Sequence, residues 1–535
     1  MLSYRKLAMR VLGRPLHTGG IDSPRPASQR AAAFILTAAM LTTLAAPAFA
    51  DIWHIENGDI TISAGESGNN VTQNNNTTYG DTNTIITNQN KDTASSHTVT
   101  IEAKDKDDKV EVTLKDVNID TSSRNKAAVS VTGEGDTNIK LDGDNALKSD
   151  IYRSGIYGSG SGSLTISGGE NDSLTAQGGS GANGISSSGS LTISGGTVTA
   201  NGDDGGRGIS SSGSVTISGG STVTANGGSG TISGGDGICS SGGVTISGGS
   251  TVTANGGNGG SLVGGDGIRS DGGVTISGGT VKAAGGDSKD GYGGDGIRSG
   301  GGVTISGNTV NAAGGNGGKV GGYGICSFDR VAISGGTVEA AGGNGSTGGG
   351  SGIYSSVIDL SGSLELTAKA GSPNGKALSQ KGSELVLDTI KDKLGPGAKV
   401  TATDADGKVI DQVSTPRPVE PEESSSSSDG GSAAPSAPAS PLPGLTVTDK
   451  DGQRISYTST QSGNTLTVCV GRFTASFRIS LAALRQLRAE GIETITFQTI
   501  LCSTTLSVDE LLAMGGEDAE AVLTHRSTDS SLTVG

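Results

Sequence analysis

A repeat unit of 24 to 30 residues runs through the middle of this chain and constrains its fold more than any other feature. Each unit contains a Gly-Ile dipeptide, a Leu/Val-Thr-Ile-Ser segment, a Val/Leu-x-Ala segment and a loop rich in glycine and asparagine. Units of this kind stack on their neighbours to bury a continuous core, which is the organisation of a solenoid. The isoleucine of the dipeptide recurs at Ile156, Ile185, Ile209, Ile238, Ile268, Ile297, Ile325 and Ile353.

Each unit holds three short apolar segments separated by glycine-rich stretches. Apolar and polar residues alternate within Val-Thr-Ile-Ser, as they do in a strand that buries one face. Proline, which cannot donate to a strand ladder, is absent from residues 51–372. The unit therefore predicts an all-β, right-handed, three-sided parallel β-helix whose coils stack about 4.8 Å apart. We expect a dry interior of Ile, Val and Ala, and glycine at corners that need positive φ angles.

The repeat also accounts for an unusual composition. The chain has 94 glycines, 3% aromatic residues and 32% hydrophobic residues, values that otherwise suggest disorder. A disordered low-complexity chain would not keep three apolar columns in phase from unit to unit. The net charge of −15 argues against nucleic-acid binding, because Lys and Arg must neutralise the phosphates.

Residues 1–50 predict a signal peptide. Basic residues precede an apolar stretch at 31–45, and Ala48-Phe49-Ala50 matches a cleavage site. An uncleaved membrane anchor is the alternative, because the apolar stretch approaches the length of a span. Pro47 favours cleavage. We therefore expect an exported, extracellular or cell-surface monomer with no membrane span after signal removal.

Composition divides the rest of the chain. Residues 51–150 have less regular alternating runs and are interpreted as an N-terminal cap with the first coils. The glycine-rich β-helix extends over 151–413. Residues 414–443 are rich in proline and serine, which is typical of a disordered linker. The remaining residues, 444–535, are expected to form a small separate α+β module.

Two helices are predicted in this C-terminal module. Leu481, Leu484 and Leu487 have helical spacing behind Ser480, a suitable N-cap, and a second short helix follows Ser507. The module also contains Cys469 and Cys502, whose pairing the sequence leaves open. The other two cysteines, Cys239 and Cys326, lie three coils apart and are too distant for a disulfide.

A position repeated in every coil becomes a column on the surface of a β-helix. The residue before Gly-Ile is an aspartate in three successive coils, at Asp236, Asp266 and Asp295. Three stacked carboxylates predict a shared Ca²⁺ ion, which favours clustered oxygen ligands. Two other interpretations stay open: each aspartate hydrogen-bonds its own turn, or it pairs with the arginines three residues further on.

Those arginines, Arg269 and Arg298, follow Gly-Ile in adjacent coils and are candidate ligand-binding residues. The alternative is a solvated row of charges. The loop before Gly-Ile varies in length at one corner of the coil, and in repeat proteins such a face is often used for binding. The four histidines are scattered, so neither a catalytic triad nor a histidine metal site is predicted.

Several segments carry a family resemblance: VEVTLKDVNID (110–120), AVSVTGEGDTNIKLDGDNAL (128–147), SGSLTISGG (161–169) and GGVTISGGTV (272–281). They resemble the carbohydrate-binding-domain β-helix proteins of bacterial surfaces, which are related in structure to polysaccharide lyases. The resemblance covers about residues 51–370. It implies a secreted or surface-attached protein that binds polysaccharide, with Ca²⁺ as a candidate cofactor.

No catalytic motif of the lyases can be placed on this sequence. We therefore expect a non-enzymatic protein that binds polysaccharide or a cell-surface glycan, or mediates adhesion. Two alternatives are kept. One is a structural stalk that displays the C-terminal module. The other is a lyase-like enzyme, in which a basic residue abstracts a proton beside a Ca²⁺-bound uronate.

Overall fold

The computed structural model describes residues 51–416 and several C-terminal stretches: 444–449, 453–455, 457–462, 464–470, 474–499, 503–514, 519–525 and 530–534. The chain divides into two compact units, one ending at Pro418 and the other beginning at Val419. The predicted signal peptide and nearly all of the predicted linker lie outside the described residues.

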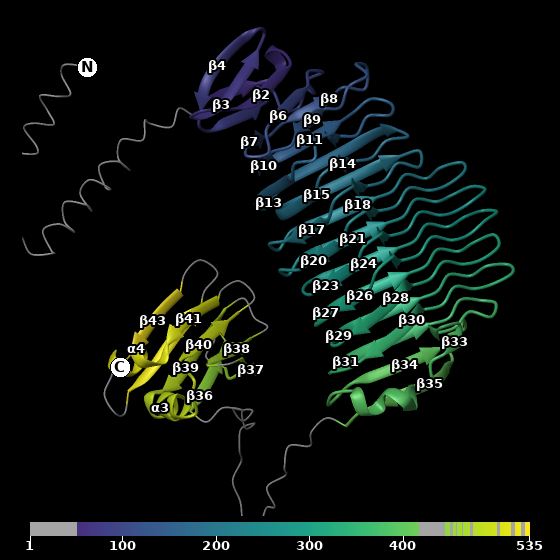
Figure 1. Cartoon of the computed structure of the whole chain (residues 1–535), viewed down its shortest axis with the longest axis vertical. Coiled ribbons are helices and arrows are strands. Elements are labelled where there is room, and N and C mark those ends of the chain that lie inside the picture. The colour runs from purple at the N-terminus through teal and green to yellow at the C-terminus, as the bar shows by residue number, and fades with distance from the viewer. Residues whose placement is uncertain are drawn as a thin grey trace, which may run out of the picture. The chain divides into compact units, whose positions relative to one another are not determined.

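The first unit is a parallel β-solenoid of about 13 turns, seen as a ladder of strands in Figure 1. The predicted parallel β-helix is thus confirmed. In its central coils the three predicted segments are three short strands, and each pairs in parallel with its counterpart in the next coil. Equivalent residues face each other, for example Ile238 with Ile268 and Val244 with Val274.

Three strand columns run along the solenoid. The first contains β2 (Ile60–Gly65), β6 (Val99–Ala103), β9 (Val129–Gly133), β12 (Ile156–Gly158), β14 (Ile185–Ser187), β16 (Ile209–Ser211), β19 (Ile238–Ser240), β22 (Ile268–Ser270), β25 (Ile297–Ser299), β28 (Ile325–Ile333), β30 (Ile353–Leu360) and β32 (Leu378–Gln380). The second contains β1 (Ile52–His54), β5 (Thr84–Thr87), β7 (Lys109–Lys115), β10 (Asp136–Asp142), β13 (Leu164–Ser180), β15 (Leu191–Asp203), β17 (Val215–Ser218), β20 (Val244–Ile246), β23 (Val274–Ile276) and β26 (Val303–Ile305), and continues into β28 and β30. The third contains β8 (Asn118–Asp120), β11 (Asp144–Lys148), parts of β13 and β15, β18 (Thr222–Asn226), β21 (Thr251–Asn255), β24 (Thr280–Ala284), β27 (Asn308–Ala313), β29 (Gly336–Ala341), β31 (Leu364–Lys369) and β34 (Lys399–Thr403).

The interior is built from the predicted Ile, Val and Ala side chains, but it is not entirely apolar. Ile268, Ile276 and Ala283 are fully buried, as are their counterparts in neighbouring coils. The serine of each Gly-Ile-x-Ser segment is buried as well. In the five coils from Ser211 to Ser327 its hydroxyl donates to a glycine carbonyl of the preceding coil, as from Ser270 to Gly242 at 2.7 Å. This serine ladder adds to the predicted Ile, Val and Ala interior a row of buried hydroxyl groups that satisfy carbonyl groups at a corner.

Glycine-rich loops project from one side of the strand ladder and stack into a flat layer, here called the fin (Figure 1). The fin comprises residues 227–237, 256–267, 285–296, 314–324 and 342–352. Each loop has an outgoing limb and a returning limb on either side of its tip. Some backbone hydrogen bonds join the two limbs of one loop, and others join limbs of adjacent loops. Gly257 N–H donates to Gly235 O, Gly265 N–H to Gly257 O, and Gly286 N–H to Gly265 O, each at 2.8 Å.

Glycine is required at many positions of the fin because the backbone of neighbouring loop segments approaches too closely there to leave room for a side chain. A Cβ atom on Gly265 would lie 1.9 Å from Gly235 O, and one on Gly294 would lie 1.9 Å from Gly265 O. The predicted reason, positive φ at corners, holds for glycines such as Gly248 and Gly249, with φ of 65° and 74°. It does not explain the fin, whose glycines are selected by close packing of the backbone.

Both ends of the solenoid carry antiparallel additions. At the N-terminal end η1 (Ile55–Asn57) precedes β2, which pairs with β3 (Gly68–Gln73), and β3 pairs with β4 (Asn76–Asp81). At the C-terminal end β33 (Ser383–Glu384) pairs with β32, η2 (Leu387–Lys393) follows, and β35 (Val409–Ser414) pairs with β34. These pairings occupy backbone groups that an open coil would offer to another chain.

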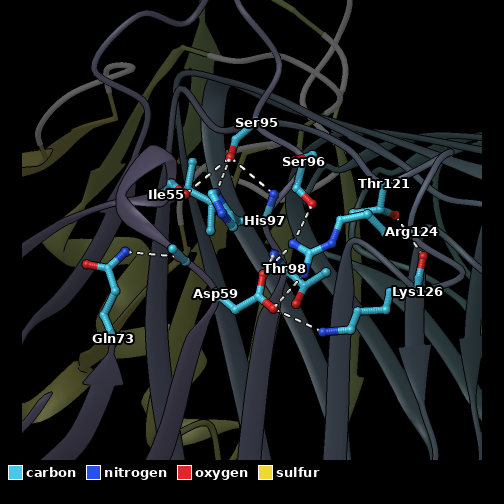
Figure 2. A network of polar contacts seen from close by, with 11 residues as sticks. Ile55, Asp59, Gln73, Ser95, Ser96, His97, Thr98, Thr121, Arg124 and Lys126 are labelled. Carbon is cyan, nitrogen blue, oxygen red and sulfur yellow. Dashed lines mark hydrogen bonds and ion pairs between the residues drawn. The ribbon is translucent and has the colours of Figure 1, made fainter. Parts of the chain in front are cut away.

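An ionic network fastens the first coil to those that follow, as Figure 2 shows. The Asp59 carboxylate lies 2.8 Å from Arg124 Nη1 and 3.0 Å from Lys126 Nζ, and it accepts the Thr98 N–H at 2.9 Å. Burial by itself would raise the pKa of Asp59. The hydrogen bonds from Arg124, Lys126 and Thr98 outweigh burial and lower this pKa to about 2.

We expect the solenoid to lose the contribution of Asp59 in acid. Because the pKa is lower in the folded chain than in the unfolded chain, the contribution is full above pH ~4 and disappears towards pH ~2. Asp59→Asn should cost about 1 kcal/mol at pH 7, a value reduced for partial exposure, and almost nothing near pH 2. Urea unfolding at both pH values measures this. The exposed Asp107→Asn is the control, and equal losses at both pH values would contradict the prediction.

The described residues of the second unit form two four-stranded sheets and two helices, as the α+β expectation requires. One sheet has the order β36 (Leu445–Thr448), β39 (Ala475–Ser480), β42 (Glu520–His525), β43 (Ser530–Val534); the other has the order β37 (Thr458–Ser462), β38 (Thr465–Cys469), β40 (Thr494–Gln498), β41 (Ser503–Ser507). Both predicted helices are confirmed, α3 (Leu481–Ala489) and α4 (Val508–Met514), and the Ser480 side chain caps α3. Phe477 and Phe497 pack in the core with ring centroids 4.9 Å apart. Within the described ranges, no helix has the length and apolar character to cross a membrane.

Candidate functional site

A groove of about 800 Å³ is lined by the fin and by the start of the first strand column. The returning limbs of the fin contribute Ser233, Val263, Tyr292 and Val320, which are bridged to one another from coil to coil. The predicted aspartate column and both predicted arginines also line this groove. The structure therefore brings all five sequence-predicted site residues together: Asp236, Asp266, Asp295, Arg269 and Arg298.

The aspartate column forms a ladder that links successive coils. Asp236 Oδ1 accepts the Asp266 N–H at 2.9 Å, Asp266 Oδ1 accepts the Asp295 N–H at 2.7 Å, and Asp295 Oδ1 accepts the Tyr323 N–H at 2.7 Å. Asn183 makes the same bond to the Arg207 N–H. Each aspartate therefore accepts a hydrogen bond from the next coil. The sequence-based interpretation that each aspartate bonds within its own turn is wrong for these bonds.

Burial alters the ionisation of this ladder. The three aspartate residues are no more than 6% exposed. Burial, together with the neighbouring Asp295 and Asp236, raises the pKa of Asp266 well above its ordinary value. Burial also raises the pKa of Asp295 to about 6, although Tyr323 N–H and Arg298 oppose the shift. Asp266 therefore retains its proton to a higher pH than an exposed aspartate does.

The arginines of the groove differ in their partners. Arg298 Nη1 lies 3.1 Å from Asp295 Oδ2, and the guanidinium lies 5.5 Å from the ring centroid of Phe328. Arg207 Nε lies 3.2 Å from Asp236 Oδ2. The predicted ion pair between an aspartate and the arginine three residues further on thus forms at Asp295. Asp236 pairs instead with Arg207, which occupies the same position before Gly-Ile as the aspartates do. Arg269 is exposed in the groove and, within the described residues, forms no ion pair.

The calcium hypothesis gains no support from this arrangement. One oxygen of each carboxylate accepts a backbone N–H, and two of the three carboxylates also hold an arginine. The described part of the chain contains no group of three or more His, Cys, Asp or Glu residues placed to hold a metal ion. Calcium binding by Asp236, Asp266 and Asp295 stays a prediction, and the contacts present favour a structural role for the ladder.

Aromatic residues near the groove were not recognised from sequence. Tyr292 is 54% exposed on the fin. Tyr323 lines the groove and stacks on Tyr354, with ring centroids 4.9 Å apart and planes at 17°. At the other end, a hollow of about 230 Å³ is lined by Tyr152 and Tyr157. Aligning the repeats by position would have revealed this clustering, which the low aromatic content of the whole chain conceals.

The cysteines of the first strand column are unsuited to nucleophilic chemistry. Burial raises the pKa of Cys239 to about 11 and raises the pKa of the buried Cys326 thiol still further. Thiolates, which are the reactive form, are therefore suppressed at both positions. Cys469, whose pairing with Cys502 the sequence left open, is a free cysteine in the structure, and its thiol donates to Gln498 Oε1 at 3.5 Å. Cys502 itself lies outside the described residues.

Comparison of the chain with protein-family models, with curated proteins and with solved structures found no match. The parallel β-solenoid is the part of the family resemblance that the structure confirms.

Proposed function

We propose that this chain is a non-enzymatic protein of the cell exterior that binds a polysaccharide in the groove beside the fin. Arg269 supports the proposal most, because its guanidinium is exposed in an 800 Å³ groove with no ion pair among the described residues. It is available for hydrogen bonds to sugar hydroxyl or carboxylate groups. The exposed ring of Tyr292 adds an apolar face for a sugar ring.

The remaining parts of the proposal rest on the sequence and on the ends of the solenoid. Export follows from the predicted signal peptide, and attachment to the cell surface or release from it both agree with that signal. A monomer agrees with the antiparallel additions at both ends, which oppose end-to-end pairing of coils.

A structural stalk is the second candidate. It is supported by the division of the chain into two compact units, with a proline- and serine-rich segment between the described parts. A stalk needs no ligand in the groove, so binding separates the two candidates. A lyase is the remaining alternative, recognised by release of unsaturated uronates from pectin.

A glycan array probed with the mature chain, with and without Ca²⁺, tests the proposal. Arg269→Ala should weaken binding by about 1.5–3 kcal/mol, because a charge-assisted hydrogen bond is lost. Lys282→Ala removes an exposed cation from the third strand column and is the matched control. Failure to bind any glycan would overturn the proposal and favour the stalk. Equal binding with and without Ca²⁺ would contradict the prediction that Ca²⁺ takes part in glycan binding.

A further inference from the structure

One position of the first strand column contributes Arg269 and Arg298 to the groove and carries a tyrosine in the coils at both ends of the series. The paired residues, coil by coil, are Tyr157, Ser186, Ser210, Cys239, Arg269, Arg298, Cys326 and Tyr354. These are seven coil steps, so at about 4.8 Å per step the two tyrosines lie ~34 Å apart along the solenoid axis.

Both ends are continuous with the groove. The hollow at Tyr157 and Tyr152 shares Gly181 and Asn183 with the lining of the groove. At the opposite end Tyr323 belongs to the lining itself and stacks on Tyr354. A chain-like ligand can therefore extend from one aromatic end to the other across the polar centre that contains Arg269.

The two ends are held at a fixed separation. Every coil between them is paired in parallel with the next, and the aspartate ladder and the fin add further bonds between coils. A ligand that reaches both ends gains the second contact without a new association step, whereas a shorter ligand gains only one. This arrangement favours long ligands over short ones.

We infer that the groove takes a linear polysaccharide lying parallel to the solenoid axis, and that the tyrosines at its two ends set the chain length needed for full affinity. The inference rests on the proposed function. It identifies the ligand class as extended and unbranched, because a branch would meet the fin on one side of the groove.

Binding measured against oligosaccharide length tests the inference. Oligogalacturonates and cello-oligosaccharides, each from the dimer to the dodecamer, serve as the anionic and the neutral probe for isothermal titration calorimetry. Affinity should rise with length and reach a plateau once the oligomer spans the groove. Tyr157→Ala should weaken binding of the longest oligomers about fivefold to tenfold and leave the shortest within about twofold.

The double variant Tyr323→Ala/Tyr354→Ala should have the same length-selective effect from the other end, and combining all three changes should abolish the dependence on length. Tyr79→Ala, which removes an exposed ring from β4 outside the groove, should change nothing. If the double variant does not fold, Tyr157→Ala alone decides. Binding that is independent of length, or equal losses for short and long oligomers, overturns the inference and leaves the proposed function standing. Absence of binding to both probe series overturns the inference, and absence of binding to any glycan on the array overturns the proposed function as well.

Discussion

Replacing Gly294 by alanine is expected to destabilise the solenoid by about 3 kcal/mol, the upper part of the range for overpacking. The new Cβ would lie 1.9 Å from Gly265 O, an atom that accepts the Gly286 N–H. Neither limb can retreat easily, because Gly294 itself donates to Gly286 O and accepts from Gly315 N–H. Chemical unfolding followed by circular dichroism measures the loss, and hydrogen exchange should show the fin opening first.

The same substitution elsewhere in the fin is the control. Gly348 has Val320 side-chain atoms as its nearest neighbours, at 3.8 Å, and it occupies the position that carries Val263, Tyr292 and Val320 in earlier coils. Gly348→Ala should therefore change stability by less than about 0.5 kcal/mol. Similar effects for Gly294→Ala and Gly348→Ala would show that close packing of the backbone does not govern the fin.

A second large effect is expected from pH. In the folded chain burial raises the pKa of Asp295 to about 6 and the pKa of Asp266 well above its ordinary value. In the unfolded chain these carboxyls titrate near pH ~4. Between pH ~4 and ~6 the folded state therefore binds more protons than the unfolded state, so stability is greatest in the acidic part of this window and falls as pH rises. We expect a loss of a few kcal/mol by pH 7.

Asp266→Asn should remove the part of this dependence that Asp266 contributes and leave the part due to the buried Asp295. Asparagine keeps an oxygen for the Asp295 N–H and carries no charge, and Asn183 already makes the equivalent bond in an earlier coil. The variant should be more stable than the natural chain at pH 7 and should differ little from it near pH 4. The exposed Asp271→Asn, in the following segment of the same coil, should leave the slope unchanged. Thermal unfolding across this pH range measures both, and an unchanged slope in Asp266→Asn would contradict the expectation.

The strand columns are predictable because buried residues leave a pattern. Ile268, Val274 and Val281 each recur once per coil, and a buried column tolerates little variation, so the period alone indicates three strands. The two helices of the C-terminal unit were predictable for similar local reasons, namely the spacing of Leu481, Leu484 and Leu487 and the cap at Ser480.

The fin was less predictable, because glycine in sequence does not reveal why it is needed. Gly249 needs its φ of 74°, whereas Gly265 needs the space that a Cβ would fill. In sequence the two positions look alike. The aspartate ladder was missed for a related reason: its partners are backbone N–H groups, which every coil offers. The pairing of Asp236 with Arg207 depends on side-chain direction, so the register alone does not reveal it.

The fin also determines where this protein can change length. In four successive coils the two bridged positions enclose the tips: Gly259 and Val263, Ser288 and Tyr292, Gly317 and Val320, and Gly345 and Gly348. The later pairs are one residue closer in sequence, yet the bonds on either side keep their register. Within the fin, the length differences among these four coils are thus absorbed at the tips. Ser233, Val263, Tyr292 and Val320, which border four of the tips, line the groove. Recombination among repeats can therefore diversify the presented surface while the paired strands stay constant.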